Sequence, residues 1–332
     1  MSPSPRRAAL IHQLVDELGL KSSDLHAARH VPTVAGYLPR VLAAATPGMV
    51  HTYRSYWLQA GDYFANRRLD DVLPSDIRAF HQHVIAAAQP RRSSRQGRHA
   101  GETALRALRN LFRLAVADGL LAAGSNPAAA VPLPRRKRST RRGLTTTEVA
   151  DINRIVLTSG NDTPLDSLLV RLHLETACRR GGALGLRLCD LDVMYCRIQL
   201  REKGGTLRWQ PVSPTLTAAL QAHANARGAR TAGDALLRSR NHGPLSSRRY
   251  DTLWARVRRL LPWADQLGVS THWLRHTTLT WVERNFGYAV AHSYAGHSHD
   301  KGTTLIYTRG TPLDVATALS AMTGEPHPLA HP

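Results

Sequence analysis

The chain has 332 residues, with 44 lysines and arginines against 24 aspartates and glutamates, and therefore a formal net charge of +20. This length is sufficient for two domains with separate hydrophobic cores. No run of about eighteen apolar residues occurs, so we expect no membrane-spanning helix. The N-terminus lacks the continuous apolar core and cleavage site of a secretory signal, and we expect a cytoplasmic protein.

The strong positive charge is the first indication of a binding partner. A chain this basic is expected to bind a polyanion, because neutralising phosphates releases condensed counterions. Nucleic acid is the leading candidate, and no basic amphipathic helix with aromatic anchors supports a membrane surface instead. Cys178, Cys189 and Cys196 lack CxxC spacing and are too few for a disulfide framework, as expected in a reducing compartment.

In the first part of the chain, apolar spacings of three, four and seven residues predict helices over 49–66, 75–88 and 102–121. Their apolar stripes contain Val50, Tyr53, Trp57, Phe64, Ile77, Phe80, Val84, Leu105, Leu108, Leu111, Phe112 and Ala115. We interpret the aromatic residues among them as core and not as a platform for stacking bases. A turn over 123–130 follows, and the segment is predicted to be a small helical bundle with basic loops.

Basic residues concentrate in two predicted connections. Residues 131–144 contain two prolines, which discourage helix, and six basic residues within eight positions. We interpret 135–143 as a basic interdomain linker between a helical domain over 1–134 and a second domain over 144–332, and expect it to lie on DNA backbone. The predicted DNA contacts are Arg135, Arg136, Lys137, Arg138, Arg141 and Arg142 in the linker, with Arg91, Arg92 and Arg95 in the loop over 89–101.

The second domain is predicted to be helical with one hairpin. A helix starts within 144–156, with a threonine N-cap about three residues before Glu148, and helix continues over 164–186. Residues 196–213 alternate apolar and polar side chains around Gly204 and Gly205, which predicts a β-hairpin, the only strands that the pattern identifies. Helices resume from Thr215, and Leu313, Val315, Ala316, Leu319 and Met322 predict a last helix over 312–326.

Three side chains of this domain are suited to chemistry on a phosphate, although each also has an ordinary interpretation. Lys203 precedes the Gly-Gly turn and would project from the hairpin tip, where an isolated lysine is usually only solvated. Arg179 precedes Gly181 and its fork suits a phosphate bidentately, or it is a common helix-end arginine. Tyr307, considered alone, is either a packed ring or a reactive hydroxyl.

Two histidines and an arginine share one face of a helix predicted over 271–285. His272, Arg275 and His276 stand at i, i+3 and i+4. The two histidines also have the spacing of zinc ligands, with His297 or His299 as a conceivable third. However, Trp273 stands where a HExxH site has its glutamate, so we expect no metal.

Taken in order, these residues resemble the motifs of the tyrosine recombinase family of the phage-integrase type. "ETACRRGGALGLRLCDLD" is similar to the family's first box, "REKGGTLRWQPVS" to its lysine hairpin, "HWLRHTT" to its histidine–x–leucine–arginine–histidine box and "AGHSHDKGTTLIYTRG" to its final box. The resemblance covers 144–310 and extends more loosely to the helices before it. It implies a mainly α fold with a small β-hairpin or sheet in the catalytic domain, in a two-domain DNA clamp whose residues 1–134 bind the core DNA site.

The resemblance also implies a function: a site-specific recombinase or integrase that cleaves and rejoins DNA through a 3′-phosphotyrosyl intermediate. The implied roles are Tyr307 as nucleophile, Lys203 as general acid, Arg179 and Arg275 as ligands of the phosphate oxygens, and His272 and His297 as donors that assist proton transfer. No cofactor or metal is implied, because the covalent link conserves the free energy of the phosphodiester bond. The implied partners are double-stranded target sites, accessory proteins and further copies in a homo-tetramer on paired sites, with a monomer or weak oligomer away from DNA and a nucleoid-associated location.

Three positions depart from the family's pattern. Gly182 stands where a carboxylate usually supports the first-box arginine, the spacing from His297 to Tyr307 is one residue longer, and Ala295 replaces a common leucine. Two alternatives stay open: a catalytically weak or inactive DNA-binding member of the same fold, and a type IB topoisomerase-like enzyme. The tail helix over 312–326 is equally open between packing on its own domain and exchange with a neighbouring subunit.

Overall fold

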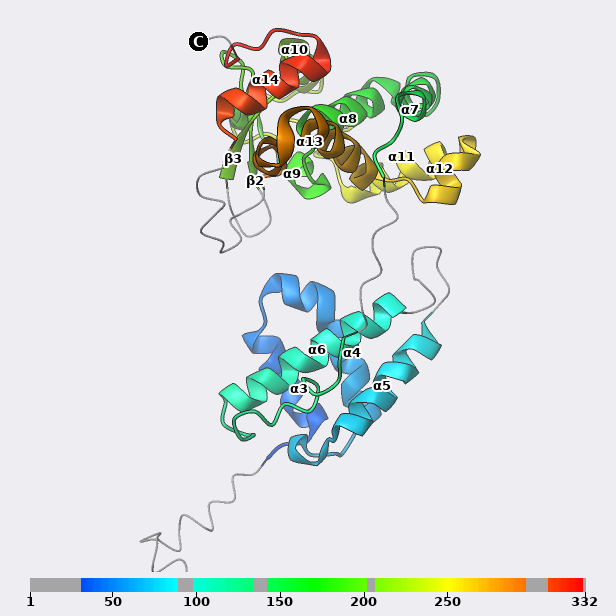
Figure 1. The fold of residues 1–332 in the computed structure, drawn as a ribbon, viewed down its shortest axis with the longest axis vertical. Helices are drawn as coiled ribbons and strands as arrows, with labels where there is room; N and C mark the ends of the chain where they lie inside the picture. Colours follow the sequence, from blue (N-terminus) through cyan, green and yellow to red (C-terminus); the bar gives the residue numbers. More distant parts are fainter. Residues whose placement is uncertain (1–30, 89–97, 134–141, 202–206, 297–309, 331–332) are drawn as a thin grey trace, which may run out of the picture. The chain divides into compact units, whose positions relative to one another are not determined.

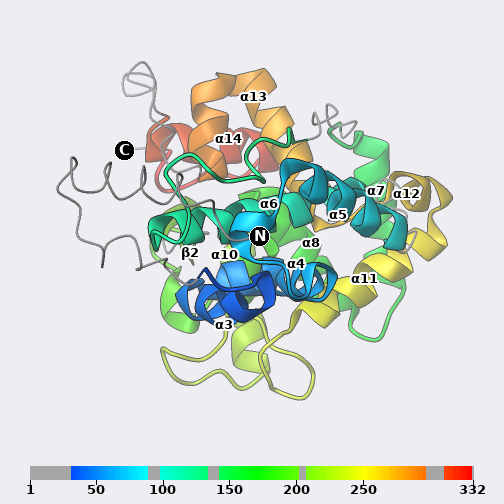
Figure 2. The same cartoon turned by 90° about the horizontal axis from the view of Figure 1, so that it is seen from below.

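The computed structural model describes residues 31–88, 98–133, 142–201, 207–296 and 310–330. The chain divides into two compact units, Met1–Lys137 and Arg138–Pro332 (Figure 1). Figure 2 shows the same helices and strands from below. Each unit contains its own cluster of buried apolar side chains. None of the helices in the described ranges has the length and apolarity that a bilayer crossing requires.

The first unit consists of helices around one core. Its described elements are α3 (Val34–Ala44), α4 (Pro47–Phe64), the 3-10 turn η1 (Leu69–Asp71), α5 (Pro74–Ala87) and α6 (Arg98–Ala117). The helices predicted over 49–66, 75–88 and 102–121 are confirmed as α4, α5 and α6. No predicted helix corresponds to α3, which contains Pro39 in its interior, where a proline normally interrupts a helix.

Aromatic side chains form the centre of this core. Trp57 is fully buried, and its Nε1 donates a hydrogen bond to the carbonyl oxygen of Ala107 at 2.9 Å. The rings of Phe64 and Phe80 are also buried, with centroids 5.6 Å apart. The prediction that the aromatic stripe is core is therefore confirmed, since these rings have no face available to a base.

The second unit is mainly helical, with a small sheet at one side (Figure 1). Its described elements are α7 (Thr146–Thr158), α8 (Thr163–Thr176), α9 (Arg180–Leu184), η2 (Leu188–Asp190), β1 (Leu191–Asp192), β2 (Arg197–Arg201), β3 (Leu207–Pro211), α10 (Pro214–Ala226), α11 (Ser247–Leu260), α12 (Pro262–Leu267), α13 (Thr271–Ala295) and α14 (Pro312–Thr323). The predicted cap of the first helix is confirmed. The Thr145 hydroxyl accepts from the Glu148 N–H at 3.2 Å, and the Glu148 carboxylate accepts from the Thr145 N–H at 2.8 Å.

The sheet has the order β1-β2-β3, and both neighbouring pairs are antiparallel. Ile198 and Leu200 of β2 point into the core, as the alternation predicts. The hairpin is confirmed in β2 and β3, whereas its predicted turn at Gly204 and Gly205 lies outside the described residues. The sheet also contains β1, which pairs with β2 and was not predicted. Two residues are too few to show an alternation in the sequence.

The helix predicted over 164–186 is broken. α8 ends at Thr176, Ala177 has a left-handed φ of 48°, and α9 begins at Arg180. A left-handed backbone costs free energy at a residue with a Cβ, and it persists only where surrounding contacts impose it. An alanine in the sequence gives no sign of such a break. The consequence is that Arg179 lies on a short loop between two helices.

A kink at Gly287 divides α13 into two straight parts. Gly287 has φ 83° and ψ 169°, a region that is essentially restricted to glycine. The first part carries His272 and Arg275, and the second part ends at Ala295. The kink therefore sets the direction in which the chain leaves α13 toward the final box.

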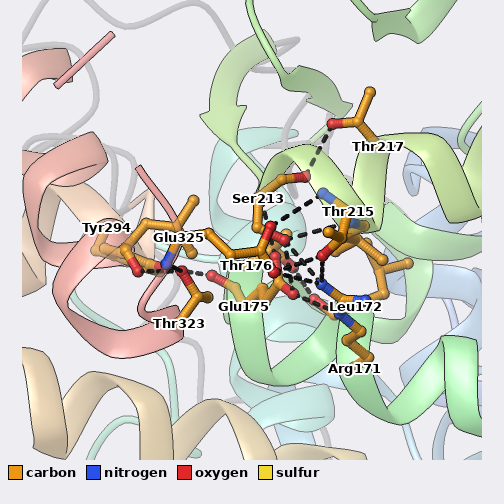
Figure 3. Close-up of polar contacts among 12 residues, drawn as sticks. Arg171, Leu172, Glu175, Thr176, Ser213, Thr215, Thr217, Tyr294, Thr323 and Glu325 are labelled. Atoms are coloured by element: carbon orange, nitrogen blue, oxygen red, sulfur yellow. Dashed lines mark hydrogen bonds and ion pairs between the residues drawn. The ribbon is translucent and has the colours of Figure 1, made fainter. Parts of the chain in front are cut away.

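The predicted last helix is confirmed as α14, which packs on α8, α13 and β3 of its own unit. A polar network holds the chain that follows it (Figure 3). The Glu325 carboxylate accepts from Arg171 Nη2 at 3.2 Å and from the Thr215 N–H at 3.0 Å, while Arg171 Nε donates to the buried Glu175 at 2.7 Å. His327 is also buried, with its Nε2 2.8 Å from a backbone oxygen of the β1–β2 turn. In the structure of one chain, α14 packs on its own domain, and exchange with a neighbouring subunit stays a prediction.

Candidate active site

One cavity of the second unit brings together three of the predicted catalytic side chains. Its volume is about 490 Å³, and Arg179, His272 and Arg275 line it. The other lining residues are Cys178, Arg180, Gly181, Tyr250, Asp251, Trp254, Arg258, Ser270 and Thr271. They come from the α8–α9 loop, from α11 and from the start of α13, so the fold closes a site from segments that are distant in sequence.

Arg275 is almost completely buried at the wall of this cavity, with 4% of its surface exposed. Its Nη1 donates to the carbonyl oxygen of Ala177, and its Nη2 donates to that of Ala295 at 2.7 Å. These bonds offset the loss of water around the guanidinium group. Because Ala177 caps the end of α8 and Ala295 ends α13, one side chain ties the Arg179 loop to the chain entering the final box.

Arg179 reaches the cavity from the N-cap position of α9, with extended backbone angles of φ −78° and ψ 153°. The next residue, Arg180, forms an exposed ion pair with Asp251 at 3.1 Å. Arg179, Arg258 and Arg275 add to the positive charge of the lining. A concave site with several guanidinium groups favours an anion, and planar forks match the paired oxygens of a phosphate.

The histidines of α13 lie as the spacing predicts. His272 and His276 have ring centroids 5.9 Å apart with planes at 85°, and His272 faces the cavity beside Arg275. Trp273 and Leu274 are buried and point toward the core. Among the residues that the structure describes, no three histidine, cysteine, aspartate or glutamate side chains are grouped as metal ligands.

Several predicted site residues lie outside the described ranges. These are Lys203, His297 and Tyr307 of the catalytic set, and Arg91, Arg92, Arg95, Arg135, Arg136, Lys137, Arg138 and Arg141 of the predicted DNA contacts. Arg142 is described: its half-exposed guanidinium donates to Glu148 at 2.5 and 2.6 Å. This hydrogen-bonded pairing lowers the pKa of Glu148 to about 2. Arg142 thus braces the cap of α7, whatever else it binds.

Sequence reasoning did not identify the contribution of α11. Tyr250, Trp254 and Arg258 stand at i, i+4 and i+8 and line the cavity together. Their spacing predicts that they share a helix face. Nothing in the sequence connects that face to Arg179, because the connection exists only after α11 packs in the unit.

The departure at Gly182 is not imposed by packing. A Cβ placed on Gly182 would lie 3.6 Å from Leu200 Cδ2 and 3.7 Å from the carbonyl oxygen of Arg201, which are ordinary van der Waals contacts. The site therefore has room for the beginning of a side chain, and the missing carboxylate is a property of the sequence.

Comparison with known proteins agrees with this geometry. Residues 142–312 match the phage integrase family. The chain is 32% identical over 241 residues to the tyrosine recombinase XerD of Mycobacterium tuberculosis, covering 68% of this chain and 73% of that one.

Two solved structures are similar in fold. One is a lambda integrase tetramer bound to a Holliday junction, with a TM-score of 0.62 and 19% identity over 95% of this chain and 89% of that one. The other is the Tn1549 transposon integrase in complex with circular intermediate DNA, with a TM-score of 0.62 and 16% identity over 86% and 98%. The fold and the family match define an enzyme of the integrase class. The chain belongs to the phage integrase family. Its activity is that of a tyrosine-type site-specific recombinase, as the resemblance of its motifs implied.

Proposed function

We propose that this recombinase breaks and rejoins double-stranded DNA through a covalent 3′-phosphotyrosyl intermediate on Tyr307. The observation that carries the proposal is the cavity in which Arg179, His272 and Arg275 meet. Two guanidinium groups suit the non-bridging oxygens of one phosphate, and they would neutralise the charge that accumulates in the transition state.

In the proposed reaction, the Tyr307 oxygen attacks phosphorus in line, and the bond between phosphorus and the 5′ oxygen breaks. Lys203 gives a proton to the leaving oxygen, which departs as a 5′-hydroxyl. His272 and His297 hydrogen-bond to the phosphate and assist removal of the tyrosine proton. Attack by a 5′-hydroxyl of another strand reverses these steps. One phosphoester replaces another, so the reaction requires no nucleotide.

We assign residues 1–134 to binding of the core DNA site, 135–143 to a basic linker and 144–332 to catalysis, with the two domains closing as a clamp on the duplex. The net charge of +20 supports this assignment, because each neutralised phosphate releases counterions. The predicted contacts to the backbone are Arg91, Arg92 and Arg95 and the basic residues of 135–142.

We extend to this chain an assembly like that of the lambda integrase tetramer: a homo-tetramer on paired sites, and a monomer or weak oligomer without DNA. Accessory proteins and a nucleoid-associated location in the cytoplasm belong to the same proposal. They follow from an activity that acts on chromosomal or mobile DNA.

A trapping experiment tests the proposed chemistry. The protein is incubated with a library of duplexes that carry a nick near the cleavage position, so that the short strand diffuses away and rejoining fails. We expect a denaturant-resistant protein–DNA adduct that persists in EDTA and is lost in Tyr307→Phe. Tyr288→Phe removes the hydroxyl of an exposed tyrosine on α13 and should keep the adduct.

The same protein and duplexes, together with a plasmid assay, distinguish a recombinase from the two alternative functions. DNA binding without an adduct on any duplex of the library would favour the inactive DNA-binding member, for which the glycine at position 182 gives a specific reason. Relaxation of a supercoiled plasmid without recombination between two sites would favour the topoisomerase-like enzyme.

A further inference from the structure

The loop that carries Arg179 is held at each of its backbone carbonyls. The carbonyl of Ala177 accepts from Arg275, and that of Arg179 accepts from the Ala183 N–H at 3.1 Å within α9. The carbonyl of Cys178, between them, lies 3.1 Å from Nδ1 of His173. The position of Arg179 therefore depends on a histidine that belongs to none of the recombinase motifs.

The partners of His173 determine its tautomer. A carbonyl oxygen can only accept, so Nδ1 carries the proton and donates to Cys178. In the neutral ring, Nε2 is then an acceptor, and the Tyr250 hydroxyl donates to it at 2.9 Å. Burial of the imidazole is complete and lowers the pKa of His173 to about 4, so the ring is neutral throughout the physiological range.

Tyr250 connects this pair to the cavity. Its ring lines the cavity from α11 and packs edge-on against His173, with centroids 5.4 Å apart and planes at 71°. Only 1% of its surface is exposed, and its hydroxyl is directed to His173. The chain of contacts thus runs from α11 through His173 on α8 to the backbone directly before Arg179.

We propose that His173 and Tyr250 are positioning residues that orient Arg179 toward the phosphate and take over the support that a carboxylate at position 182 would give. This inference rests on the proposed function, because it assumes that Arg179 binds the scissile phosphate. The pair suits this role because it fixes the backbone directly beside the arginine, is fully hydrogen-bonded and keeps the same charge near neutral pH. A buried polar pair with every donor and acceptor satisfied is also more specific in geometry than apolar packing.

Variants of the pair separate positioning from packing. His173→Asn keeps a donor at the place of Nδ1 but loses the Tyr250 contact, whereas His173→Leu removes both bonds of the histidine ring. We expect the initial rate of strand cleavage to fall about tenfold or more in His173→Leu and about threefold in Tyr250→Phe. His173→Asn should recover most of the loss caused by leucine, and DNA affinity should stay within about twofold in all three.

Matched controls lie elsewhere in the chain. His223 on α10 has a similarly lowered pKa of about 4, because it is largely buried, and it accepts a backbone N–H at 3.2 Å. Tyr37 donates its hydroxyl to Asp118 at 2.7 Å in the first unit. His223→Asn and Tyr37→Phe remove comparable bonds far from Arg179 in sequence and outside the cavity lining, and we expect unchanged cleavage rates.

A neutral substrate gives the decisive readout. When a methylphosphonate replaces the scissile phosphate, one charged oxygen is absent and the arginine has less charge to neutralise. Defects that act through Arg179 should then shrink to within about twofold of the unsubstituted protein, as they should for Arg179→Ala itself. Equal defects of His173→Leu and Tyr250→Phe on both substrates, or no defect on either, would overturn the positioning role.

The outcomes also separate the inference from the function on which it rests. If Arg179→Ala cleaves native DNA as fast as the unsubstituted protein, or the unsubstituted protein gives no adduct, the proposed function fails and the inference fails with it. If Arg179→Ala is defective and recovers on the neutral substrate while both pair variants behave like the controls, only the inference fails. Should His173→Leu not fold, as judged by thermal unfolding, Tyr250→Phe alone decides.

Discussion

Replacement of Gly287 by alanine isolates the free energy stored in the kink of α13. A Cβ at this position has no neighbouring atom within 4 Å, so no steric clash accompanies the change. What changes is the backbone: φ 83° and ψ 169° lie in a region that residues with a Cβ avoid at a cost of about 1–3 kcal/mol. Alanine also restricts the unfolded chain, which returns about 0.4–1 kcal/mol.

The net expectation for Gly287→Ala is a loss of about 1–2 kcal/mol in the free energy of unfolding. For a unit of this size, that corresponds to a fall in Tm of about 3–6 °C. Two other glycines calibrate the series, because neither has an atom within 4 Å of an added Cβ. Gly268 has the milder left-handed φ of 63°, so Gly268→Ala should cost less. Gly233 has no positive φ, and Gly233→Ala should be neutral or slightly stabilising.

Calorimetry measures the Tm of the three variants, and the trapping assay measures their rates of adduct formation. The Tm should be highest for Gly233→Ala, lower for Gly268→Ala and lowest for Gly287→Ala. Gly287→Ala should also slow the adduct, since a straightened α13 would redirect the chain that leads to His297. A Tm for Gly287→Ala equal to that of Gly233→Ala would refute the assignment of strain to this kink.

Three further predictions use the same assays. Gly182→Ala should fold with a Tm within about 2 °C of the unsubstituted protein, because its Cβ meets only ordinary contacts, and a large loss of Tm would contradict the space described at this site. Gly182→Glu should speed the adduct by supplying a carboxylate near Arg179. Glu148 has a folded-state pKa of about 2, below its usual value of 4.5, so its stabilisation is complete above pH 4.5 and is lost as pH falls toward 2. Since Arg142 is half-exposed and screened by solvent, the loss should be about 1 kcal/mol, and Glu148→Gln should remove this part of the acid dependence of Tm. Gly310 stands three residues after Tyr307, and a Cβ added to it would lie 2.8 Å from the backbone Cα of Val290. Gly310→Ala should therefore lower Tm by a few degrees and slow adduct formation. An unchanged rate of adduct formation would show that this close approach does not position the nucleophile.

The parts of the fold that follow from local periodicity were predictable. Trp57 and Phe80 recur on helix faces that must be buried, and Ile198 and Leu200 alternate on a strand with one covered side. These patterns are visible because burial repeats with the period of the element. The side chains of the site were predictable for a different reason: Arg179, His272 and Arg275 stand in motifs of fixed spacing.

What could not be predicted depends on contacts between segments that are distant in sequence. The left-handed backbone of Ala177 is held by Arg275, nearly a hundred residues away, and an alanine carries no sign of it. Strand β1 exists because β2 offers it hydrogen bonds, and two residues leave no periodic trace. His173 belongs to a helix whose sequence looks entirely structural, and its link to Tyr250 is formed only by packing.

The anchoring of the C-terminal tail has a consequence for assembly. Glu325 and His327 have hydrogen-bond partners within the described part of one protomer, and a tail exchanged between copies would meet the same partners on its neighbour. Such an exchange gains almost no contact energy, so its equilibrium is governed by the effective concentration of neighbouring copies. On the proposal that tails are exchanged, a protomer in dilute solution would keep its own tail, and protomers bound side by side on one DNA molecule would exchange tails at little cost. On the same proposal, the DNA would raise the local concentration of copies and so determine when they become linked.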